Sequence, residues 1–211
     1  MEKIILIGGG GHARSIIDTI ISSGVFTIAG IVDNFEGEVL GIPVIGDDRK
    51  LTEIFNSGIR NAFVAIGSVG DTTLRKNTLD MILKIGFTVP NIVDKTAVVS
   101  VNTAIGFGNF IGKNAVVNCD CTIGNMVIIN SNATVEHNSY VGDFSHIASG
   151  AVLCGTVTIG KNTHIGANAT VIQGVTIGED CLIGAGSVVL GNINDRVKAY
   201  GNPCRVAGDK V

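Results

Sequence analysis

An apolar residue recurs at every sixth position through the second half of the chain, and this period constrains the fold more than any other feature. From Val93 to Val189, each sixth residue is Ile, Val or Leu without exception. A fixed hexapeptide period is typical of a parallel β-helix, in which each hexamer supplies one short strand and one corner. Three hexamers would close a triangular coil, and successive coils would hydrogen-bond at the strand spacing of about 4.8 Å.

Two further columns of the repeat support this interpretation. The residue three places after each aliphatic is mostly Asn, Asp or Gly, the types that tolerate the positive φ of a sharp corner. The residue four places after it is Ala, Ser, Thr, Cys or Val at every repeat except Asn109, and such small residues can share the interior with large aliphatics. The pattern does not set the handedness, for which the general rule of parallel crossovers favours a right-handed coil.

The first 90 residues lack the period and alternate strands with helices instead. We expect strands at 3–7, 28–32 and 62–66, and helices around 16–21, 47–56 and 72–85. This alternation predicts a small parallel α/β sheet. The chain should therefore hold two domains, a Rossmann-like domain over 1–90 and a β-helix with a C-terminal tail over 91–211.

Composition and charge exclude several classes of protein. Abundant Ile, Val and Leu argue against intrinsic disorder, and a formal net charge of -3 without a basic run favours neither nucleic acid nor an anionic membrane as partner. No segment resembles a signal peptide or a membrane span. Five cysteines without paired CxxC units indicate reduced thiols in a cytoplasmic protein rather than a disulfide framework or a zinc ribbon.

A glycine-rich loop follows the first expected strand and opens the first helix. Gly8-x-Gly10-x-x-Ala13 has the spacing of a dinucleotide-type phosphate loop, and Asp33 ends the next strand, where its carboxylate could accept a ribose hydroxyl. Because the sheet is about half of a full dinucleotide domain, a mononucleotide or nucleotide-sugar is favoured over NAD. A tight turn that binds nothing is the alternative, and His12 at the loop exit either contacts a ligand or caps the helix.

Three histidines lie in the repeat region. His146 and His164 are one coil apart and would stack on one face, whereas His137 precedes His146 by half a coil and belongs to another face. A neutral imidazole suits general-base catalysis near neutral pH, and His137, preceded by Glu136, is the candidate base. A solvated ladder is the alternative for His146 and His164, and we favour it for His164. A metal site is disfavoured, because the His and His-x4-His ligand pattern of the γ-class carbonic anhydrases, which share this repeat, is missing.

Gly155 stands one coil above His137. An uncrowded N–H there could face the oxyanion that forms when a thioester carbonyl is attacked, and a plain corner glycine is the alternative. The neighbouring Cys154 follows an inward aliphatic and has no evident activating partner, so we interpret it as structural rather than nucleophilic.

With these motifs the sequence resembles the bacterial sugar acetyltransferases that join a nucleotide-binding α/β domain to a left-handed β-helix. Sialic acid O-acetyltransferases and the N-acetyltransferases of UDP-linked 4-amino-dideoxy sugars, including the bacillosamine-type enzymes, belong to this family. The resemblance covers nearly the whole chain. It rests on residues 8–14 (GGGGHAR), Val32-Asp33-Asn34, Ala65-Ile66-Gly67, Asn130, Glu136-His137, residues 142–146 (GDFSH) and Gly201-Asn202-Pro203.

The resemblance implies a left-handed coil, a homotrimer and acetyl-CoA held between adjacent β-helices. It implies that His137 is the general base and that Glu136 orients or polarises it. The residues implied for the nucleotide-sugar are Gly8, Gly10, Gly11, His12, Asp33, Asn34, Gly67 and Asn130, the last at the acceptor. The residues implied for acetyl-CoA are His146, Gly155, His164, Gly166, Gly184, Asn202 and Pro203, with the Gly155 N–H on the acetyl oxygen. Cys204 and His164 depart from the family pattern, which often has Ala and an apolar residue there.

We therefore expect an acetyl-CoA-dependent acetyltransferase that acts on an amino group of a UDP-linked amino-dideoxy sugar. The acceptor would attack the thioester directly, with no covalent enzyme intermediate and no metal. One alternative keeps the fold and makes the acceptor a hydroxyl of sialic acid or another sugar. Another alternative is a trimeric ligand-binding scaffold that catalyses nothing.

Overall fold

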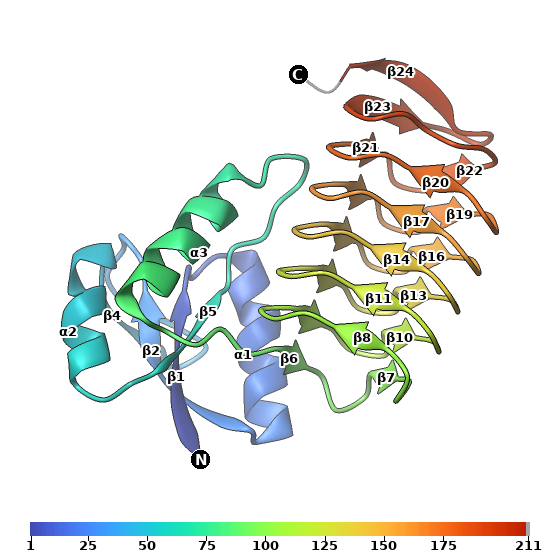
Figure 1. The fold of residues 1–211 in the computed structure, drawn as a ribbon. Helices are drawn as coiled ribbons and strands as arrows, with labels where there is room; N and C mark the ends of the chain where they lie inside the picture. Colours follow the sequence, from blue (N-terminus) through green and yellow to red (C-terminus); the bar gives the residue numbers. More distant parts are fainter. Residues whose placement is uncertain (210–211) are drawn as a thin grey trace. The chain divides into compact units, whose positions relative to one another are not determined.

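The computed structural model of the chain describes residues 1–209, which fall into two compact units (Figure 1). The first unit comprises residues 1–68 and 72–95. The second comprises residues 69–71 and the chain from Thr96 onward.

The first unit is a five-stranded sheet with helices, in the strand order β3-β4-β2-β1-β5. Its elements are β1 (Glu2–Ile7), α1 (Gly11–Ser23), β2 (Phe26–Val32), β3 (Glu38–Val39), β4 (Ile42–Gly46), the 3₁₀ turn η1 (Asp48–Lys50), α2 (Leu51–Asn56), β5 (Asn61–Val64), α3 (Thr73–Ile85) and β6 (Ile92–Val93). The strands and helices expected from the sequence are all present. One expectation needs correction, because β3 and β4 pair antiparallel at the edge of an otherwise parallel sheet. Leu40 and Gly41 join them with φ of 51° and 78°, the two positive values of a tight hairpin turn.

The core of this unit lies between β1 and α1. Residues 4–7 of β1 are almost fully buried because β2 and β5 flank the strand on both sides. Ile16, Ile17 and Ile20 form the buried face of α1, which ends at Gly24 in the left-handed conformation. The Thr19 hydroxyl donates to the buried Asp94 carboxylate at 2.9 Å and ties α1 to the segment after β6.

The second unit is a parallel β-helix built from two-residue strands. The strands are β7 (Val98–Val99), β8 (Ala104–Ile105), β9 (Phe110–Ile111), β10 (Val116–Val117), β11 (Thr122–Ile123), β12 (Ile128–Ile129), β13 (Thr134–Val135), β14 (Tyr140–Val141), β15 (His146–Ile147), β16 (Val152–Leu153), β17 (Thr158–Ile159), β18 (His164–Ile165), β19 (Thr170–Val171), β20 (Thr176–Ile177), β21 (Leu182–Ile183) and β22 (Val188–Val189). Every third strand pairs in parallel register, as Thr134 pairs with Val152. Three faces result, and Figure 1 shows the coils stacked as successive rungs. The hexapeptide prediction is confirmed.

The predicted interior column is buried in all but its first members. From Ile111 to Val189 the aliphatic at every sixth position is at most 2% exposed. Burial of these side chains is the main stabilising term of the coil, since each short strand contributes little alone.

The corners have the positive φ that the Asn, Asp and Gly column predicted. From Gly108 to Gly186 every sixth residue has φ between 54° and 73°. Met126, Phe144 and Thr156 share this conformation although their types disfavour it, Thr most of all because it is β-branched. The stacked coils therefore impose the corner geometry on whichever residue occupies the column.

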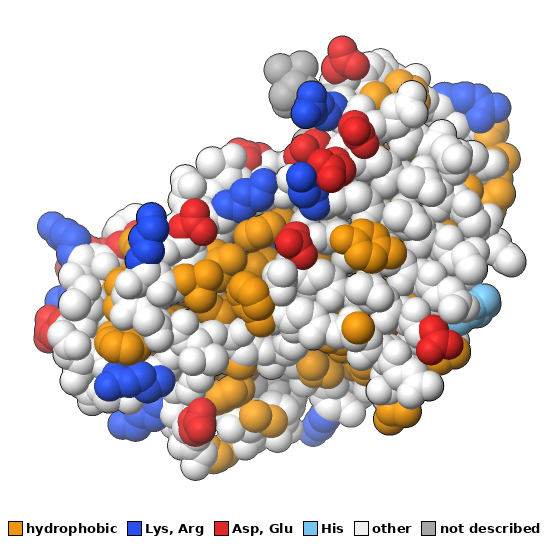
Figure 2. Space-filling view, viewed as in Figure 1, with side chains coloured by type: hydrophobic (Ala, Val, Ile, Leu, Met, Phe, Trp, Pro, Cys, Tyr) orange, Lys and Arg blue, Asp and Glu red, His pale blue; other side chains and the backbone are white. Residues whose placement is uncertain are grey.

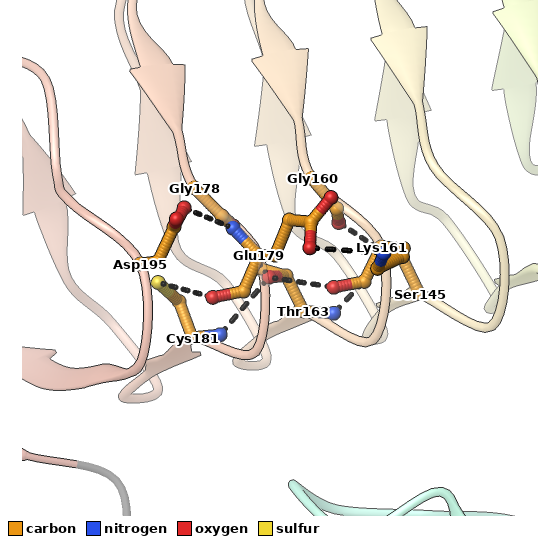
Figure 3. A network of polar contacts seen from close by, with 8 residues as sticks. All are labelled: Ser145, Gly160, Lys161, Thr163, Gly178, Glu179, Cys181 and Asp195. Carbon is orange, nitrogen blue, oxygen red and sulfur yellow. Dashed lines mark hydrogen bonds and ion pairs between the residues drawn. The ribbon is translucent and has the colours of Figure 1, made fainter.

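Hydroxyl and thiol side chains link the coils at one corner (Figure 3). Ser145 Oγ donates to the Gly160 carbonyl at 2.8 Å and accepts from the Thr163 N–H at 3.2 Å. One coil further on, Thr163 Oγ1 donates to the Gly178 carbonyl at 2.7 Å and accepts from the Cys181 N–H at 3.0 Å. These bonds satisfy backbone groups that the corner leaves without a strand partner.

The segment expected as a tail forms a hairpin. The strand β23 (Val197–Tyr200) pairs in parallel with β21, and β24 (Arg205–Asp209) returns antiparallel to it. Asn202 and Pro203 lie in the turn between them, joined by a cis peptide bond.

No helix among residues 1–209 is both long and apolar enough to cross a membrane. Acidic and basic side chains are mixed over the face shown in Figure 2, and no broad area of one charge forms there.

Candidate active site

The glycine-rich loop of the first unit runs from the end of β1 into α1. Gly8 has φ of 99°, and a β-carbon there would lie 2.7 Å from Ile66 Cγ1, so this position requires glycine. Gly10 and Gly11 differ, because a β-carbon at either would meet nothing within 4 Å. Neither packing nor a positive φ requires glycine at these two positions, and their backbone faces open space.

The N-terminus of α1 is suited to an anion. Its N-cap, Gly10, supplies no side-chain hydrogen bond, and the first turn holds no acidic residue. The first N–H groups of a helix lack intrahelical acceptors, and the helix dipole adds positive potential at that end. A phosphate group is a fitting ligand for this arrangement.

Asp33 fastens the loop to the end of β2. Its Oδ2 accepts from the Gly9 N–H at 2.7 Å, and its Oδ1 accepts from the Asn34 N–H at 2.6 Å. The sequence predicted that this carboxylate takes a ribose hydroxyl, and within the chain both of its oxygens hold the backbone. Any contact with a ribose would have to use their remaining lone pairs.

The predicted nucleotide residues of the first unit line one pocket of about 490 Å³. Gly67 approaches His12 across it, since a β-carbon at Gly67 would lie 3.2 Å from His12 Cβ. The lining contains Gly8, Gly10, Gly11, His12, Asp33, Asn34 and Gly67, and also Asp48, Leu74 and Thr78, which sequence reasoning missed. Those three lie in η1 and α3, and no motif marked them. A second hollow of about 730 Å³ shares Asp33 and Asn34 and extends to Phe35 and Arg49.

In the second unit, His137 is exposed at the corner after β13. Its Nδ1 lies 2.9 Å from Asn138 Oδ1, and an amide oxygen can only accept. In the neutral tautomer that donates from Nδ1 to this oxygen, Nε2 keeps a lone pair that can accept a proton. Asn138 was not among the predicted site residues, although its place directly after the candidate base could have indicated it.

Gly155 lies directly against the His137 ring. A β-carbon at position 155 would lie 2.6 Å from Nε2 and 2.7 Å from Cε1 of the imidazole, so only glycine leaves room for the ring. Within residues 1–209 the Gly155 N–H donates no hydrogen bond, while the corresponding corner N–H groups of Cys119 and Ser131 donate to the side chains of Asn118 and Asn130. An imidazole and an available N–H donor thus lie side by side, the two kinds of group that acyl transfer uses.

Glu136 has a different partner from the one expected. Its Oε2 accepts from Asn118 Nδ2 at 2.8 Å, and the oxygen that lies against His137 Nδ1 is Asn138 Oδ1. Within residues 1–209, no hydrogen bond from Glu136 to the His137 ring provides the predicted orientation. An influence of Glu136 through its charge stays a prediction.

The other predicted histidines form a pair on the face that holds β12, β15 and β18. The rings of His146 and His164 meet edge to face with centroids 4.8 Å apart, and Asn130 Nδ2 lies 3.3 Å from His146 Nε2. The stacking of the two rings in adjacent coils is confirmed. The sequence-based interpretation of His164 as a solvated residue is wrong, because His164 is only 8% exposed among the packed coils.

Within one chain, the predicted site residues of the β-helix lie at two different corners of the coil. His137 and Gly155 lie at the corner after β13 and β16, whereas Asn130, Gly166 and Gly184 lie at the corner before β13, β19 and β22. Gly166 and Gly184 also have a packing reason, since a β-carbon at either would lie within 2.7 Å of the next coil. Asn202 and Pro203 lie in the exposed turn after β23.

No group of three His, Cys, Asp or Glu within residues 1–209 is placed to hold a metal ion. No disulfide joins any of the five cysteines, all of which lie within residues 1–209. Burial raises the pKa of the Cys121 and Cys204 thiols, which favours the unreactive protonated form.

Two family models match the chain. The PglD N-terminal domain matches residues 3–82, and the bacterial transferase hexapeptide repeat matches 120–155 and 156–191. No curated protein sequence matches it.

Solved structures match nearly the whole chain. A histidine variant of perosamine N-acetyltransferase from Caulobacter crescentus, in complex with CoA and GDP-perosamine, is 37% identical with a TM-score of 0.94, over 99% of this chain and 98% of that one. The chain belongs to the hexapeptide-repeat family of sugar N-acetyltransferases. The acetyltransferase domain of PglB from Neisseria gonorrhoeae, in complex with acetyl coenzyme A, is 31% identical with a TM-score of 0.91, over 97% and 98% of the two chains. WeeI from Acinetobacter baumannii, 19% identical with a TM-score of 0.69 over 98% and 100%, shows the fold alone.

Membership in this acetyltransferase family confirms the resemblance seen in the sequence and the acyltransferase class. It also confirms the fold, an α/β domain followed by a left-handed β-helix, so the general crossover rule does not hold for this coil.

Proposed function

We propose that the chain transfers the acetyl group of acetyl-CoA to an amino group of a nucleotide-linked amino-dideoxy sugar. The observation that carries this proposal is the pairing of His137 Nε2 with the backbone of Gly155, a base against an available N–H. CoA, acetyl-CoA and a nucleotide-linked amino sugar are the ligands of the similar solved structures.

In the proposed reaction the acceptor nitrogen attacks the thioester carbonyl while His137 Nε2 takes its proton. The tetrahedral oxyanion accepts a hydrogen bond from the Gly155 N–H. Collapse of this intermediate breaks the carbon–sulfur bond, and the departing CoA thiolate takes the proton from the imidazolium. An amide and free CoA result, and no covalent enzyme intermediate or metal is needed.

The domain roles follow from the two sites. The 1–90 domain would bind the nucleotide, with a phosphate at the N-terminus of α1, and the 91–211 domain would bind acetyl-CoA. Asn130 would contact the acceptor, and His146 would lie near the thioester. His164 is buried and would support His146 rather than touch the coenzyme. The further residues that we assign to acetyl-CoA are Gly166, Gly184, Asn202 and Pro203.

A homotrimer would complete the site. Because one chain holds His137 and Asn130 at different corners, the imidazole of one subunit would face the acetyl-CoA edge of its neighbour. Free thiols fit the reducing cytoplasm, where we place the protein.

Thiol release from acetyl-CoA in the presence of single acceptors tests the proposal. The acceptors are a UDP-linked and a GDP-linked 4-amino sugar and free sialic acid. We expect release with a nucleotide-linked amino sugar and a product that gains one acetyl group resistant to hydroxylamine, as an amide is. A hydroxylamine-labile product from sialic acid would show O-transfer instead. No release with any acceptor would favour a binding scaffold and overturn the proposal.

A further inference from the structure

The second hollow of the first unit, of about 730 Å³, lies at the carboxyl ends of β2 and β4. The two strands run parallel, and the Asp33 N–H donates to the Gly46 carbonyl at 2.9 Å where they end. Asp33 and Asn34 line both this hollow and the pocket of the glycine-rich loop, so the hollow continues the pocket past the residue predicted for the ribose. Open α/β sheets bind their ligands at this edge.

Phe35 presents an aromatic ring to this hollow. The residue is 41% exposed and lines the space. Its ring lies on the glycine-rich loop, since a β-carbon at Gly9 would be 2.7 Å from Phe35 Cε1 and 2.8 Å from Cζ. A side chain at position 9 would push the ring away, so the glycine leaves room for the aromatic ring.

The loop beneath the ring is held in place. Asp33 Oδ2 accepts from the Gly9 N–H at 2.7 Å, and a β-carbon at Gly9 would lie 3.4 Å from Val39 Cγ2. The ring therefore rests on a fixed backbone, while part of its surface stays open to the hollow. An aromatic ring with such support can stack against another flat ring.

The charges around the hollow suit a neutral ring rather than a second phosphate. Its lining includes a single cationic side chain, Arg49, and three carboxylates, those of Asp33, Glu36 and Asp47. Arg49 is already paired, because its Nε donates to Asp47 Oδ2 at 3.0 Å. Carboxylates accept hydrogen bonds, and the N–H groups of a nucleobase are donors.

We propose that the nucleobase of the nucleotide-sugar lies in the second hollow and stacks on Phe35. This inference rests on the proposed function, which gives the first unit a nucleotide ligand. The phosphate at the N-terminus of α1, the ribose near Asp33 and the base on Phe35 then follow one another as they do in a nucleotide. Every base has a flat π face, so Phe35 supplies affinity and does not choose the base.

A fluorescence measurement tests the stacking directly. The chain contains no tryptophan, so Phe35→Trp introduces a single indole at this position. Stacking against a base quenches indole fluorescence. We expect saturable quenching of Phe35→Trp by UDP or GDP, over the concentrations at which calorimetry shows binding. Ribose 5-diphosphate lacks the base and should cause no quenching.

Phe107→Trp is the matched control. Phe107 is also 41% exposed, but it belongs to the β-helix and lines neither the pocket nor the hollow. UDP and GDP should leave the fluorescence of this variant unchanged.

Two further variants separate stacking from packing. Phe35→Leu keeps an apolar side chain over Gly9 and removes the ring, whereas Phe35→Tyr keeps the ring. Calorimetry should show an affinity for the nucleoside diphosphate that is about tenfold weaker in Phe35→Leu and close to that of the wild type in Phe35→Tyr. The affinity for acetyl-CoA should not change in either. These measurements decide the question if Phe35→Trp does not fold.

Three results would overturn the inference while nucleotide binding, and with it the proposed function, stands. They are unchanged fluorescence of Phe35→Trp at saturating nucleotide, equal quenching by ribose 5-diphosphate, and wild-type affinity in Phe35→Leu. A wild-type protein that binds neither UDP nor GDP would instead overturn the nucleotide role of the first unit.

Discussion

At the residue scale, the positions of one loop are occupied by glycine for different physical reasons. Gly8 is required by its positive φ and by the close approach of Ile66. Gly10 has an ordinary φ of -74° and lines the pocket with open space where its side chain would be. A glycine that the fold does not need is best explained by a ligand that approaches the backbone.

Gly10→Ala should therefore affect binding more than folding. We expect the free energy of unfolding to fall by about 1 kcal/mol, because a β-carbon at Gly10 meets nothing within 4 Å and only the N-cap preference for glycine over alanine is lost. The KM for the nucleotide-sugar should rise at least about tenfold, since loss of one phosphate contact costs 1.4 kcal/mol or more. The KM for acetyl-CoA should not change. Steady-state kinetics with each substrate varied checks this, and equal effects on both would contradict a separate nucleotide site.

Gly155→Ala should remove activity without unfolding the coil. Its methyl group would lie 2.6 Å from His137 Nε2, which displaces the ring and covers the N–H proposed for the oxyanion. We expect kcat to fall by about a hundredfold or more. Gly191→Ala is the control, since a β-carbon there meets nothing within 4 Å and should leave kcat unchanged. A Gly155→Ala enzyme with wild-type kcat would remove this glycine from the mechanism.

The sequence could predict the place of these residues but not their partners. The period puts Gly155 one coil from His137, and the structure has the two in contact. The same period puts Asn118 one coil from Glu136, yet the choice of Glu136 between Asn118 and His137 depends on side-chain angles that no periodicity encodes. For Asp33 the motif indicated a ribose ligand, and its bonds to the loop N–H groups follow from the course of the backbone.

At the scale of elements, each strand is too short to be stable alone, so the bonds between corners are important. Strand positions and corner residues were predictable, because a six-residue period fixes which side chains point inward. The positive φ of Phe144 and Thr156 was not predictable from residue type, since the stacked coils override local preference. The corner of Phe144 is among those that hold the hydroxyl contacts of Figure 3.

Thr163→Val should destabilise the coil. The substitution keeps the shape of the side chain and leaves the Cys181 N–H and the Gly178 carbonyl without their partner. We expect a loss of about 2 kcal/mol in the free energy of unfolding. Thr170→Val is the control, because the Thr170 hydroxyl makes no hydrogen bond within residues 1–209 and its strand favours valine. Denaturant unfolding at one protein concentration compares the two, and equal stabilities would show that the ladder contributes nothing.

At the scale of the whole molecule, the site we propose is shared between subunits. Sedimentation should give a trimer. We expect the His137→Ala trimer and the His146→Ala trimer each to be inactive. Co-expression of the two variants should restore activity, because some interfaces of the mixed trimers combine an intact His137 from one subunit with an intact His146 from its neighbour. Random mixing leaves about a quarter of the interfaces intact. Mixed trimers that stay as inactive as both parents would show that each site is contained in one chain.

The central claim is that the exposed His137 ring, over the backbone of Gly155, takes the proton of the acceptor. It is tested most directly by kcat of His137→Ala with acetyl-CoA and a nucleotide-linked amino sugar, with CoA affinity measured by calorimetry on the same preparation. We predict a loss of at least about a hundredfold in kcat and an unchanged dissociation constant for CoA. Turnover close to that of the wild-type enzyme would contradict the account.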